Sequence, residues 1–491
     1  MREGQLYING KFVNSNSRKT FVSLNPATAK PFGIYQAGNK KDVDNAVKAA
    51  KKALPSWKKT PAPKRAEILF EVSSLLRKNK EKLAKIMVLE MGKILKETRG
   101  DVQEAIDIFE YMTGEGRRLF GHTAPSELKN KFCLTFRIPL GIVGLITPWN
   151  FPIAIPAWKL APALICGNTC IFKPSSDTPG CAVELIKILE KACIPKGVVN
   201  LITGSADDVG IQIIKHPNLN GISFTGSVET GEFITANAGL KKVGLELGGK
   251  NAIIVMDDAD LDLALDGIIW GAFGTTGQRC TAASRVIVHK KVKKELEEKL
   301  VKKAEKLRLG SGLKETTDIG PLINQKAVEK SEYYTNLGKK QKAKLLCGGQ
   351  KADMNGFFFR PTVFANVKPK MRIAQEEIFG PIVSLISVSN LNEAIKVCNS
   401  VKYGLSSAIY TNNIRNAMIA INEIEAGITY VNSSTIGAEV HLPFGGVKAT
   451  GHGREAGWTA IEEFSEEKTV YIDYSGKLQR VQIDTVDVKK K

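Results

Sequence analysis

Three polar residues of this chain have side chains that suit covalent catalysis. Cys280 lies in GTTGQRCTAAS (274–284), where glycines permit close approach and little apolar bulk could bury the sulfur. Glu246 ends the apolar run VGLEL, and a buried carboxyl there would have a raised pKa suited to a general base. Asn150, in TPWNFP, carries an amide that could hold an oxyanion. Together they predict a thiol nucleophile, its base and an oxyanion site.

Each of these residues also has a structural interpretation. A cysteine is more often a small buried hydrophobe than a nucleophile. Glu246 could pair with a lysine at a strand end, and Asn150 could satisfy a turn beside Pro148. Arg279 is a cation that could favour the thiolate of Cys280. Taken one at a time, the residues leave both interpretations open.

A glycine-containing turn supplies a candidate phosphate site. In FTGSVETGEF, the residues Gly226, Ser227 and Gly231 lie between a predicted strand and an apparent helix. Backbone amides at the start of that helix could meet a pyrophosphate. The turn lacks the GxGxxG pattern, and an ordinary strand-to-helix turn uses the same residue types.

The elements that must position these groups are those of an α/β protein. From Gly141 onward, short β-branched runs alternate with helical patterns, which predicts a parallel, doubly wound sheet with strands buried on both faces. The predicted strands are IVGLIT, NTCIFKP, VVNLITG, GISFTG, VGLEL and NAIIVM. Before this region, a short start leads into a long helical stretch.

Two helices show the pattern most clearly. CAVELIKILEKAC carries an apolar stripe that ends at Cys193, with Thr178 as the predicted cap and Pro179 as the first helical residue. The strand predicted at 284–291 precedes an amphipathic helix at 292–307. Strand-like and helix-like patterns continue to alternate after residue 307, so we expect a second α/β domain.

Residues 141–172 are apolar enough to resemble a membrane span, with Lys159 as their only charge. Prolines would interrupt a continuous helix repeatedly, so we predict a buried strand, a turn and a core helix instead. These prolines are Pro148, Pro152, Pro156 and Pro162.

Composition limits the class of protein. The 491 residues include 70 Lys and Arg against 50 Asp and Glu, a net charge of +20 that is spread along the chain without aromatic-basic clusters. We therefore predict no nucleic-acid partner and no membrane partner. Eight cysteines form no CxxC pair and the N-terminus shows no export signal, which indicates a cytoplasmic location. Five histidines lack ligand spacing, so we predict no metal site.

In their order along the chain, TPWNFP, FTGS, ELGGKN and GQRC resemble the aldehyde dehydrogenase superfamily, and IFKPSSDTP, QEEIFGP and LPFGG extend the resemblance over nearly all of it. The resemblance implies an α/β fold of two Rossmann-type domains plus a small β element for oligomerisation. Residues 1–117 and 138–249 would form the cofactor-binding domain and 250–463 the catalytic domain. Residues 118–137 and 464–491 would form the oligomerisation element, giving a homodimer or homotetramer.

The family mechanism assigns a role to each polar group. Cys280 would attack an aldehyde, and the Asn150 amide with the Cys280 backbone N–H would hold the oxyanion. Glu246 would activate the water that hydrolyses the resulting thioester to a carboxylic acid. The enzyme implied is a non-acylating oxidoreductase that depends on NAD or NADP.

The resemblance also implies the cofactor contacts. At Ser176, relatives selective for NAD often carry a glutamate that would repel a 2′-phosphate. Serine here, with Lys173 nearby, predicts that NADP is accepted and favoured over NAD. The cofactor-binding residues implied are Thr147, Trp149, Lys173, Ser176, Gly226, Ser227, Gly231, Leu247, Glu377 and Phe379.

The loop NSSTIGAEVHLPFGG occupies the place where the family anchors the far end of the substrate. Its candidate contacts are Glu439, His441 and Phe444. Its SxxGAE pattern is similar to that of enzymes acting on amino- or carboxylate-bearing semialdehydes, and the alternative is an enzyme of broad aliphatic specificity.

Two other functions compete with this one. A CoA-acylating aldehyde dehydrogenase shares the fold but typically lacks a glutamate at the ELGG position, so Glu246 argues against it. A non-catalytic binding protein on the same fold is the second alternative. The presence of Cys280, Glu246, Asn150, Lys173 and Glu377 together argues against a loss of chemistry.

Overall fold

The β-branched runs after residue 141 form the centre of a seven-stranded sheet in the computed structural model, which describes residues 1–483. Five strands are parallel, and a hairpin continues the sheet antiparallel at one edge. The order is β12-β11-β8-β9-β10-β2-β3. The strands are β2 (Leu6–Ile8), β3 (Lys11–Val13), β8 (Ile142–Ile146), β9 (Thr169–Lys173), β10 (Val199–Leu201), β11 (Gly221–Thr225) and β12 (Lys242–Glu246).

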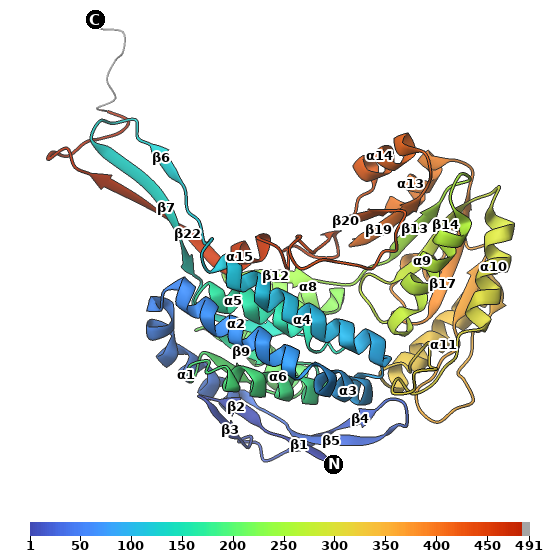
Figure 1. Cartoon of the computed structure of the whole chain (residues 1–491), viewed down its shortest axis with the longest axis horizontal. Helices are drawn as coiled ribbons and strands as arrows, with labels where there is room; N and C mark the ends of the chain where they lie inside the picture. Colours follow the sequence, from blue (N-terminus) through green and yellow to red (C-terminus); the bar gives the residue numbers. More distant parts are fainter. Residues whose placement is uncertain (484–491) are drawn as a thin grey trace, which may run out of the picture.

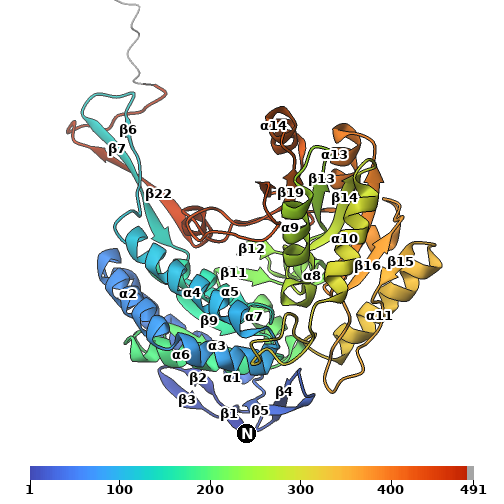
Figure 2. The ribbon, with the colours of Figure 1, turned by 45° about the vertical axis from the view of Figure 1, so that its right-hand side comes forward.

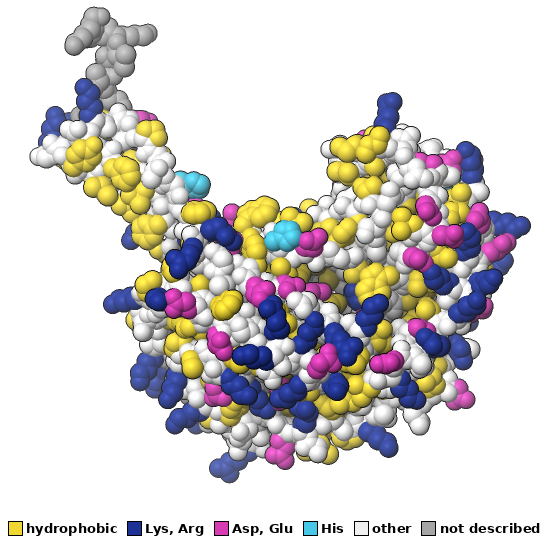
Figure 3. Space-filling view, in the orientation of Figure 1, with side chains coloured by type: hydrophobic (Ala, Val, Ile, Leu, Met, Phe, Trp, Pro, Cys, Tyr) yellow, Lys and Arg dark blue, Asp and Glu magenta, His cyan; other side chains and the backbone are white. Residues whose placement is uncertain are grey.

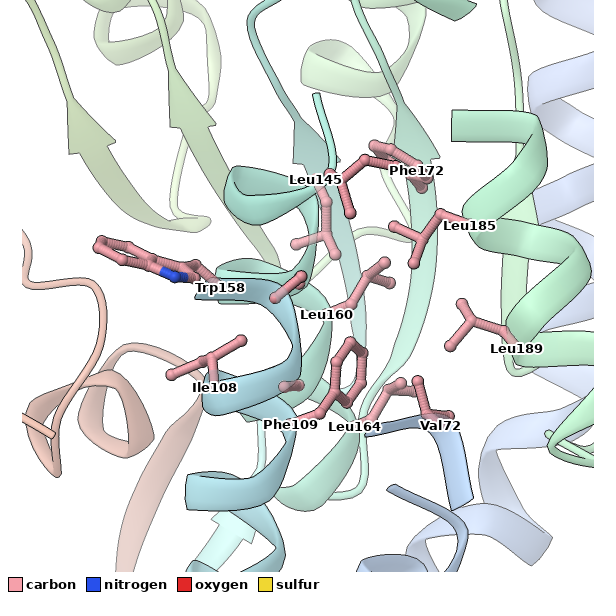
Figure 4. Close-up of a cluster of buried hydrophobic side chains, with 14 of the residues drawn as sticks. Val72, Ile108, Phe109, Leu145, Trp158, Leu160, Leu164, Phe172, Leu185 and Leu189 are labelled. Carbon is pink, nitrogen blue, oxygen red and sulfur yellow. The ribbon is translucent and has the colours of Figure 1, made fainter. Parts of the chain in front are cut away.

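Helices pack on both faces of this sheet (Figure 1), and successive side chains enter two different cores. In β8, Val143 and Leu145 belong to one core, whereas Ile142 and Ile146 belong to the other. Figure 4 shows the first core, where Phe109 packs among leucine side chains. Burial on both faces explains why these strands are continuously apolar. The helices are α1 (Lys40–Lys59), α2 (Ala62–Lys78), α3 (Lys80–Met91), α4 (Leu95–Glu115), α5 (Ala154–Ile165), α6 (Pro179–Lys191), the π-helical turn η1 (Ala206–Gly210), α7 (Ile211–Lys215) and α8 (Val228–Asn237).

Helix α6 begins at Pro179 with Thr178 at the N-cap, as the sequence predicts. It ends at Lys191, and Cys193 follows with a φ of 61° and an exposed side chain. The prediction that Cys193 completes the buried stripe is therefore wrong, because the chain adopts a left-handed conformation there and leaves the helix.

The first forty residues contain more strand than the sequence indicates. Three strands form a small sheet in the order β1-β5-β4, and the predicted long helical stretch follows as α1 to α4. The strands are β1 (Arg2–Gly4), β4 (Thr20–Asn25) and β5 (Lys30–Gln36). This sheet escapes prediction because its strands are short and mostly half-exposed, so they lack a run of buried apolar residues.

The apolar stretch 141–172 folds as strand β8, an irregular turn, helix α5 and the first part of β9. Every residue of α5 is buried, including Lys159. Within residues 1–483, no helix has the length and apolar character needed to cross a bilayer. The predicted strand, turn and core helix are confirmed.

A second seven-stranded sheet, order β15-β16-β17-β14-β13-β19-β20, forms the other lobe and is parallel except for β15. Its strands are β13 (Asn251–Val255), β14 (Ala283–His289), β15 (Lys344–Cys347), β16 (Thr362–Ala365), β17 (Ile382–Val388), β19 (Ser406–Tyr410) and β20 (Ile428–Val431). The helices are α9 (Leu261–Phe273), the 3₁₀ turn η2 (Gly274–Gly277), α10 (Lys293–Glu305), α11 (Gln325–Lys340), α12 (Arg372–Gln375), α13 (Leu391–Asn399) and α14 (Ile414–Glu423). The short helix α15 (Thr459–Glu463) packs instead on α5 of the first lobe and on β22 of the arm. Strands β18 (Tyr403–Gly404) and β21 (Val447–Lys448) pair separately. The expected second α/β unit is present.

Three antiparallel strands form an arm that projects from the first lobe (Figures 1 and 2). They are β6 (Thr123–Pro125), β7 (Lys131–Pro139) and β22 (Ser465–Asp473). Hydrophobic side chains lie exposed along the arm (Figure 3). These include Phe132, Phe136, Tyr471 and Ile472. The predicted oligomerisation element 464–491 contains β22, and its last residues, 484–491, lie outside the described part of the chain.

Candidate active site

Cys280 and Glu246 line one cavity of about 220 Å³, although they lie 34 positions apart in the sequence. Glu246 ends strand β12 of the first sheet, and Cys280 lies in the loop between η2 and β14 of the second lobe. Both lobes therefore contribute to the walls. The apolar side chains of Phe151, Trp158 and Phe444 are also part of the cavity lining.

The loop before Cys280 adopts an unusual conformation that its neighbours maintain. Thr275 and Thr276 have φ values of 51° and 58°, in the left-handed region that threonine rarely adopts. The Glu97 carboxylate accepts a hydrogen bond from the Thr275 backbone N–H at 2.6 Å. On the other side, Asn251 Nδ2 donates to the Cys280 carbonyl at 2.7 Å. These contacts hold the thiol at a fixed place on the cavity wall.

Burial raises the pKa of the Cys280 thiol to about 12, and the negative potential of Glu246 adds to the effect. The Arg279 guanidinium is engaged elsewhere: Nε donates to Thr275 Oγ1 at 2.8 Å, and Nη2 donates to Glu97 at 3.3 Å. The hypothesis that Arg279 lowers the pKa of the thiol is therefore wrong, because burial dominates and the guanidinium faces a carboxylate of its own.

Glu246 is 4% exposed, and neither carboxylate oxygen has a hydrogen-bond partner within residues 1–483. Burial, reinforced by the nearby carboxylates of Glu455 and Glu463, raises its pKa well above the ordinary value. The alternative that Glu246 pairs with a lysine is not what the structure shows, because Lys159 pairs with Glu455 instead. The expected buried carboxyl is present.

Behind Glu246 lies a buried polar network that sequence reasoning missed. Lys159 contacts the Glu455 carboxylate and donates to Ser223 Oγ at 2.8 Å. Ser223 Oγ in turn donates to Glu463 Oε1 at 2.6 Å, and burial raises the pKa of Glu463 to about 6. The one available signal was Lys159, the single charge in an otherwise apolar stretch. Its two carboxylate neighbours come from nearly 300 residues away.

Asn150 is 3% exposed and donates through Nδ2 to the Gln278 carbonyl at 3.1 Å. An amide nitrogen carries two hydrogens, so one N–H remains available. The Cys280 backbone N–H has no hydrogen-bond acceptor within the described residues. These two donors are on neighbouring loops, and they could serve one oxyanion.

Most predicted cofactor residues lie where the parallel strands of the first sheet end. Thr147 follows β8, Lys173 ends β9, Gly226 follows β11 and Leu247 follows β12. Ligands of open α/β sheets bind at this edge. Within residues 1–483, Thr147 Oγ1 is buried without a hydrogen-bond partner. Lys173 Nζ donates to the Pro174 carbonyl at 3.1 Å, and burial lowers the pKa of Lys173 to about 8. An unsatisfied hydroxyl and a buried amine at this edge fit a polar cofactor such as a dinucleotide.

The start of α8 and a loop of the second lobe hold the remaining predicted cofactor residues. Ser227 caps α8, and a Cβ on Gly231 would lie 2.6 Å from Leu247 Cδ1, so only glycine permits this close packing. Glu377 accepts a hydrogen bond from the Gly249 N–H at 3.0 Å. The rings of Trp149 and Phe379 meet edge to face at 5.5 Å. Ser176 Oγ donates to the Gly204 carbonyl at 2.8 Å.

The predicted substrate residues separate into two groups. Phe444 lines the cavity and meets Trp158 edge to face at 5.2 Å. Glu439 and His441 have side chains 69% and 55% exposed, lie 3.6 Å apart and do not line this cavity. Substrate contact by these residues stays a prediction.

Two cavity residues gave no sequence signal: Glu104, on α4, and Trp270, on α9. Each reads in sequence as an ordinary helical residue, since only the packing of the two lobes brings these helices to one cavity. No cluster of His, Cys, Asp or Glu within residues 1–483 has the geometry of a metal site.

A family model described as "Aldehyde dehydrogenase family" matches residues 12–470. The α-ketoglutaric semialdehyde dehydrogenase of Bacillus subtilis (strain 168) is 41% identical over 474 residues, covering 95% of this chain and 97% of that protein. Retinaldehyde dehydrogenase 3 of Mus musculus is 40% identical over 480 residues, covering 96% and 93%. Betaine aldehyde dehydrogenase of Staphylococcus aureus, solved in complex with NAD+, superposes with a TM-score of 0.95 at 33% identity, covering 96% and 95%. The chain therefore belongs to the aldehyde dehydrogenase family.

Proposed function

We propose that Cys280 is the nucleophile and Glu246 the general base of an NAD(P)-dependent oxidation of an aldehyde to a carboxylic acid. The observation that carries this assignment is that both side chains line the same cavity. Attack by the Cys280 sulfur on the aldehyde carbon forms a thiohemiacetal. Asn150 Nδ2–H and the Cys280 N–H stabilise its oxyanion.

The second half of the reaction depends on Glu246. Lys173 and Glu377 would help to hold NAD(P), which would supply a hydride acceptor when bound. Loss of hydride from the carbon attached to Cys280 would leave a thioester. Glu246 then removes a proton from water as that water attacks the thioester carbonyl, and the acid and the free thiol are released. The raised pKa of Glu246 suits this step, because a base with a pKa nearer the working pH removes a proton more readily. A buried carboxyl here favours hydrolysis over transfer of the acyl group to CoA.

The cavity supports a small aldehyde that carries a carboxylate. Its volume of about 220 Å³ is below the ~300 Å³ at which pockets begin to hold drug-sized ligands, which disfavours a long apolar aldehyde. The Arg279 guanidinium lines the cavity and still has N–H donors free after its bonds to Thr275 and Glu97. The Bacillus relative is named for a semialdehyde of this type.

The substrate proposal is tested with a panel of 2,5-dioxopentanoate, 4-oxobutanoate, pentanal and retinaldehyde, followed by reduced-cofactor absorbance. We expect kcat/KM to be at least about tenfold higher for the two carboxylate-bearing aldehydes than for retinaldehyde. A single unfavourable fit in a pocket changes the ratio of kcat/KM between two substrates by about that factor. Arg279→Met should remove the preference for the carboxylate over pentanal. A highest kcat/KM for retinaldehyde would contradict the proposal, and strict dependence on CoA would reassign the reaction.

We also propose that NADP is accepted and favoured over NAD. Ser176 presents a neutral hydroxyl, held by the Gly204 carbonyl, at a position where a carboxylate would repel a 2′-phosphate. Ser176→Glu is expected to lower kcat/KM with NADP by about tenfold or more relative to NAD, as a like charge near a phosphate costs roughly 1–2 kcal/mol. Ser175→Ala is the matched control and should leave the ratio unchanged. A wild-type enzyme that prefers NAD would contradict the proposal.

We propose the division into a cofactor domain (1–117, 138–249), a catalytic domain (250–463) and an oligomerisation element (118–137, 464–491). The 249/250 boundary is supported because β12 of the first sheet ends at Glu246 and β13 of the second sheet begins at Asn251. The apolar side chains exposed on the arm support assembly into a homodimer or a homotetramer. All eight cysteines are free thiols, which supports a reducing cytoplasmic location.

A further inference from the structure

Glu104 is a carboxyl on the cavity wall that the reaction does not use. It projects from α4 and lines the same cavity as Cys280 and Arg279. Within the described residues it forms no hydrogen bond and no ion pair, unlike the other acidic groups of this region. An acidic side chain without a partner at the edge of a small cavity is costly to keep charged.

The cations nearest to Glu104 already have acidic partners. Lys93 donates to Asp101 at 2.7 Å, with both side chains fully buried. Arg279 pairs with Glu97 at 3.3 Å. Both cations also contact the Phe151 ring, whose centroid is 3.3 Å from Lys93 Nζ and 5.4 Å from Arg279 Cζ.

The charge balance of this wall therefore depends on Glu104. Lys93 and Arg279 already pair with Asp101 and Glu97, so ionisation of Glu104 adds one uncompensated negative charge to this wall. Asp107, one helical turn farther along α4, adds negative potential, accepts a hydrogen bond from Gln103 and forms no ion pair within residues 1–483. Of the other ionisable groups that line the cavity, Glu455 pairs with Lys159. Burial raises the pKa of Cys280 and of Glu246, which favours the neutral form of both groups.

We propose that Glu104 determines substrate specificity by its charge: the ionised carboxylate excludes an anionic aldehyde from the cavity, and the protonated carboxyl admits it. The proposal rests on the proposed oxidation of a carboxylate-bearing aldehyde. A substrate carboxylate that approaches Arg279 must share a cavity of about 220 Å³ with Glu104, and two carboxylates in one small, poorly solvated cavity repel each other. A neutral aldehyde experiences no such repulsion.

Glu104 changes its charge within the pH range in which the enzyme can be assayed. Burial, followed by the negative charge of Asp101, raises the pKa of Glu104 to about 7, while Lys93 and Arg279 partly offset the rise. Below pH 7 the side chain is protonated and can donate a hydrogen bond to the substrate carboxylate. Above pH 7 it ionises, and the fraction of enzyme competent for an anionic substrate falls with each further rise in pH.

The test compares two substrates of similar length that differ in charge, 4-oxobutanoate and pentanal, between pH 6 and pH 8.5 with saturating cofactor. The ratio of their kcat/KM values cancels the titration of Cys280 and Glu246, which both substrates need. We expect the ratio of 4-oxobutanoate to pentanal to fall by about tenfold over this range in the wild type. Glu104→Gln should make the ratio flat at its low-pH level.

Two further variants keep the result interpretable. Glu104→Asp retains the charge and should retain a falling ratio even if the glutamine variant folds poorly. Glu110→Gln changes an exposed residue of the same helix that pairs with Arg77, and should leave the wild-type profile unchanged. A wild-type ratio that does not change with pH, or a fall that survives in Glu104→Gln, would overturn the role of Glu104. Failure to oxidise either aldehyde would instead overturn the proposed function.

Discussion

Replacing Cys280 by alanine is expected to abolish cofactor reduction, lowering kcat/KM by about 10⁴-fold or more, as loss of a covalent nucleophile does in other enzymes. The sulfur lies on the wall of the cavity that Glu246 also lines. No other cysteine lines that cavity, so no second thiol within residues 1–483 can replace it. Reduced-cofactor absorbance with saturating 4-oxobutanoate measures the loss.

A matched control is available in Cys193, which is exposed and lies outside the cavity. Cys193→Ala should keep wild-type kcat/KM, which separates loss of the nucleophile from general thiol chemistry. The unfolding midpoint of Cys280→Ala should stay close to that of the wild type, because the change removes one polar atom at a cavity surface. Substantial steady-state turnover by Cys280→Ala would contradict the proposed mechanism.

Replacing Glu246 by glutamine is expected to separate the two halves of the reaction. The thioester should still form, giving a burst of about one equivalent of reduced cofactor per active site, while steady-state turnover falls by about 10²–10⁴-fold because no base activates water. Glutamine preserves the shape of the side chain in a buried place. Stopped-flow absorbance measures the burst and the slow phase in one experiment.

The pH dependence of the slow phase identifies the base. Burial raises the pKa of Glu246. In the wild type, the active carboxylate form is therefore depleted at acid pH, and turnover should keep rising with pH above the range in which an exposed glutamate titrates. Glu246→Gln should lose that rise. Glu229→Gln, which changes an exposed residue near the start of α8, should keep both the burst and the rise. Loss of the burst itself in Glu246→Gln would show that Glu246 acts before thioester formation.

The sequence was sufficient to nominate the three central residues because each occupies a strong local context. Cys280 follows glycines and small polar residues, Glu246 ends an apolar strand, and Asn150 lies in a proline-rich turn. The order of their motifs along the chain indicated the family. Charge states were less accessible, since the pKa of Cys280 depends on burial and on carboxylates distant in sequence.

The strands and helices of the first lobe could be predicted because apolar runs and helix caps depend on residues close together in the sequence. Thr178 and Pro179 begin α6 as expected. The end of that helix was harder to predict, because a single left-handed residue, Cys193, outweighs a continuing apolar pattern. The sequence nominated Glu439 and His441 as substrate contacts. Their exposure could not be predicted, because it depends on how the loop 432–446 lies against the catalytic lobe.

By itself, the sequence determined the α/β class and indicated the family, and it nominated the thiol nucleophile and the sheet edge proposed for the dinucleotide, since periodicity, motifs and strand ends are local properties. Only the tertiary structure decided which residues surround the cavity. Glu104, Trp270 and Arg279 meet in one cavity because two lobes pack together, and the Lys159–Glu455 pair joins residues 296 positions apart. Electrostatic interactions depend on distance in space and on burial, so the charge balance of the cavity could not be read from the order of residues along the chain.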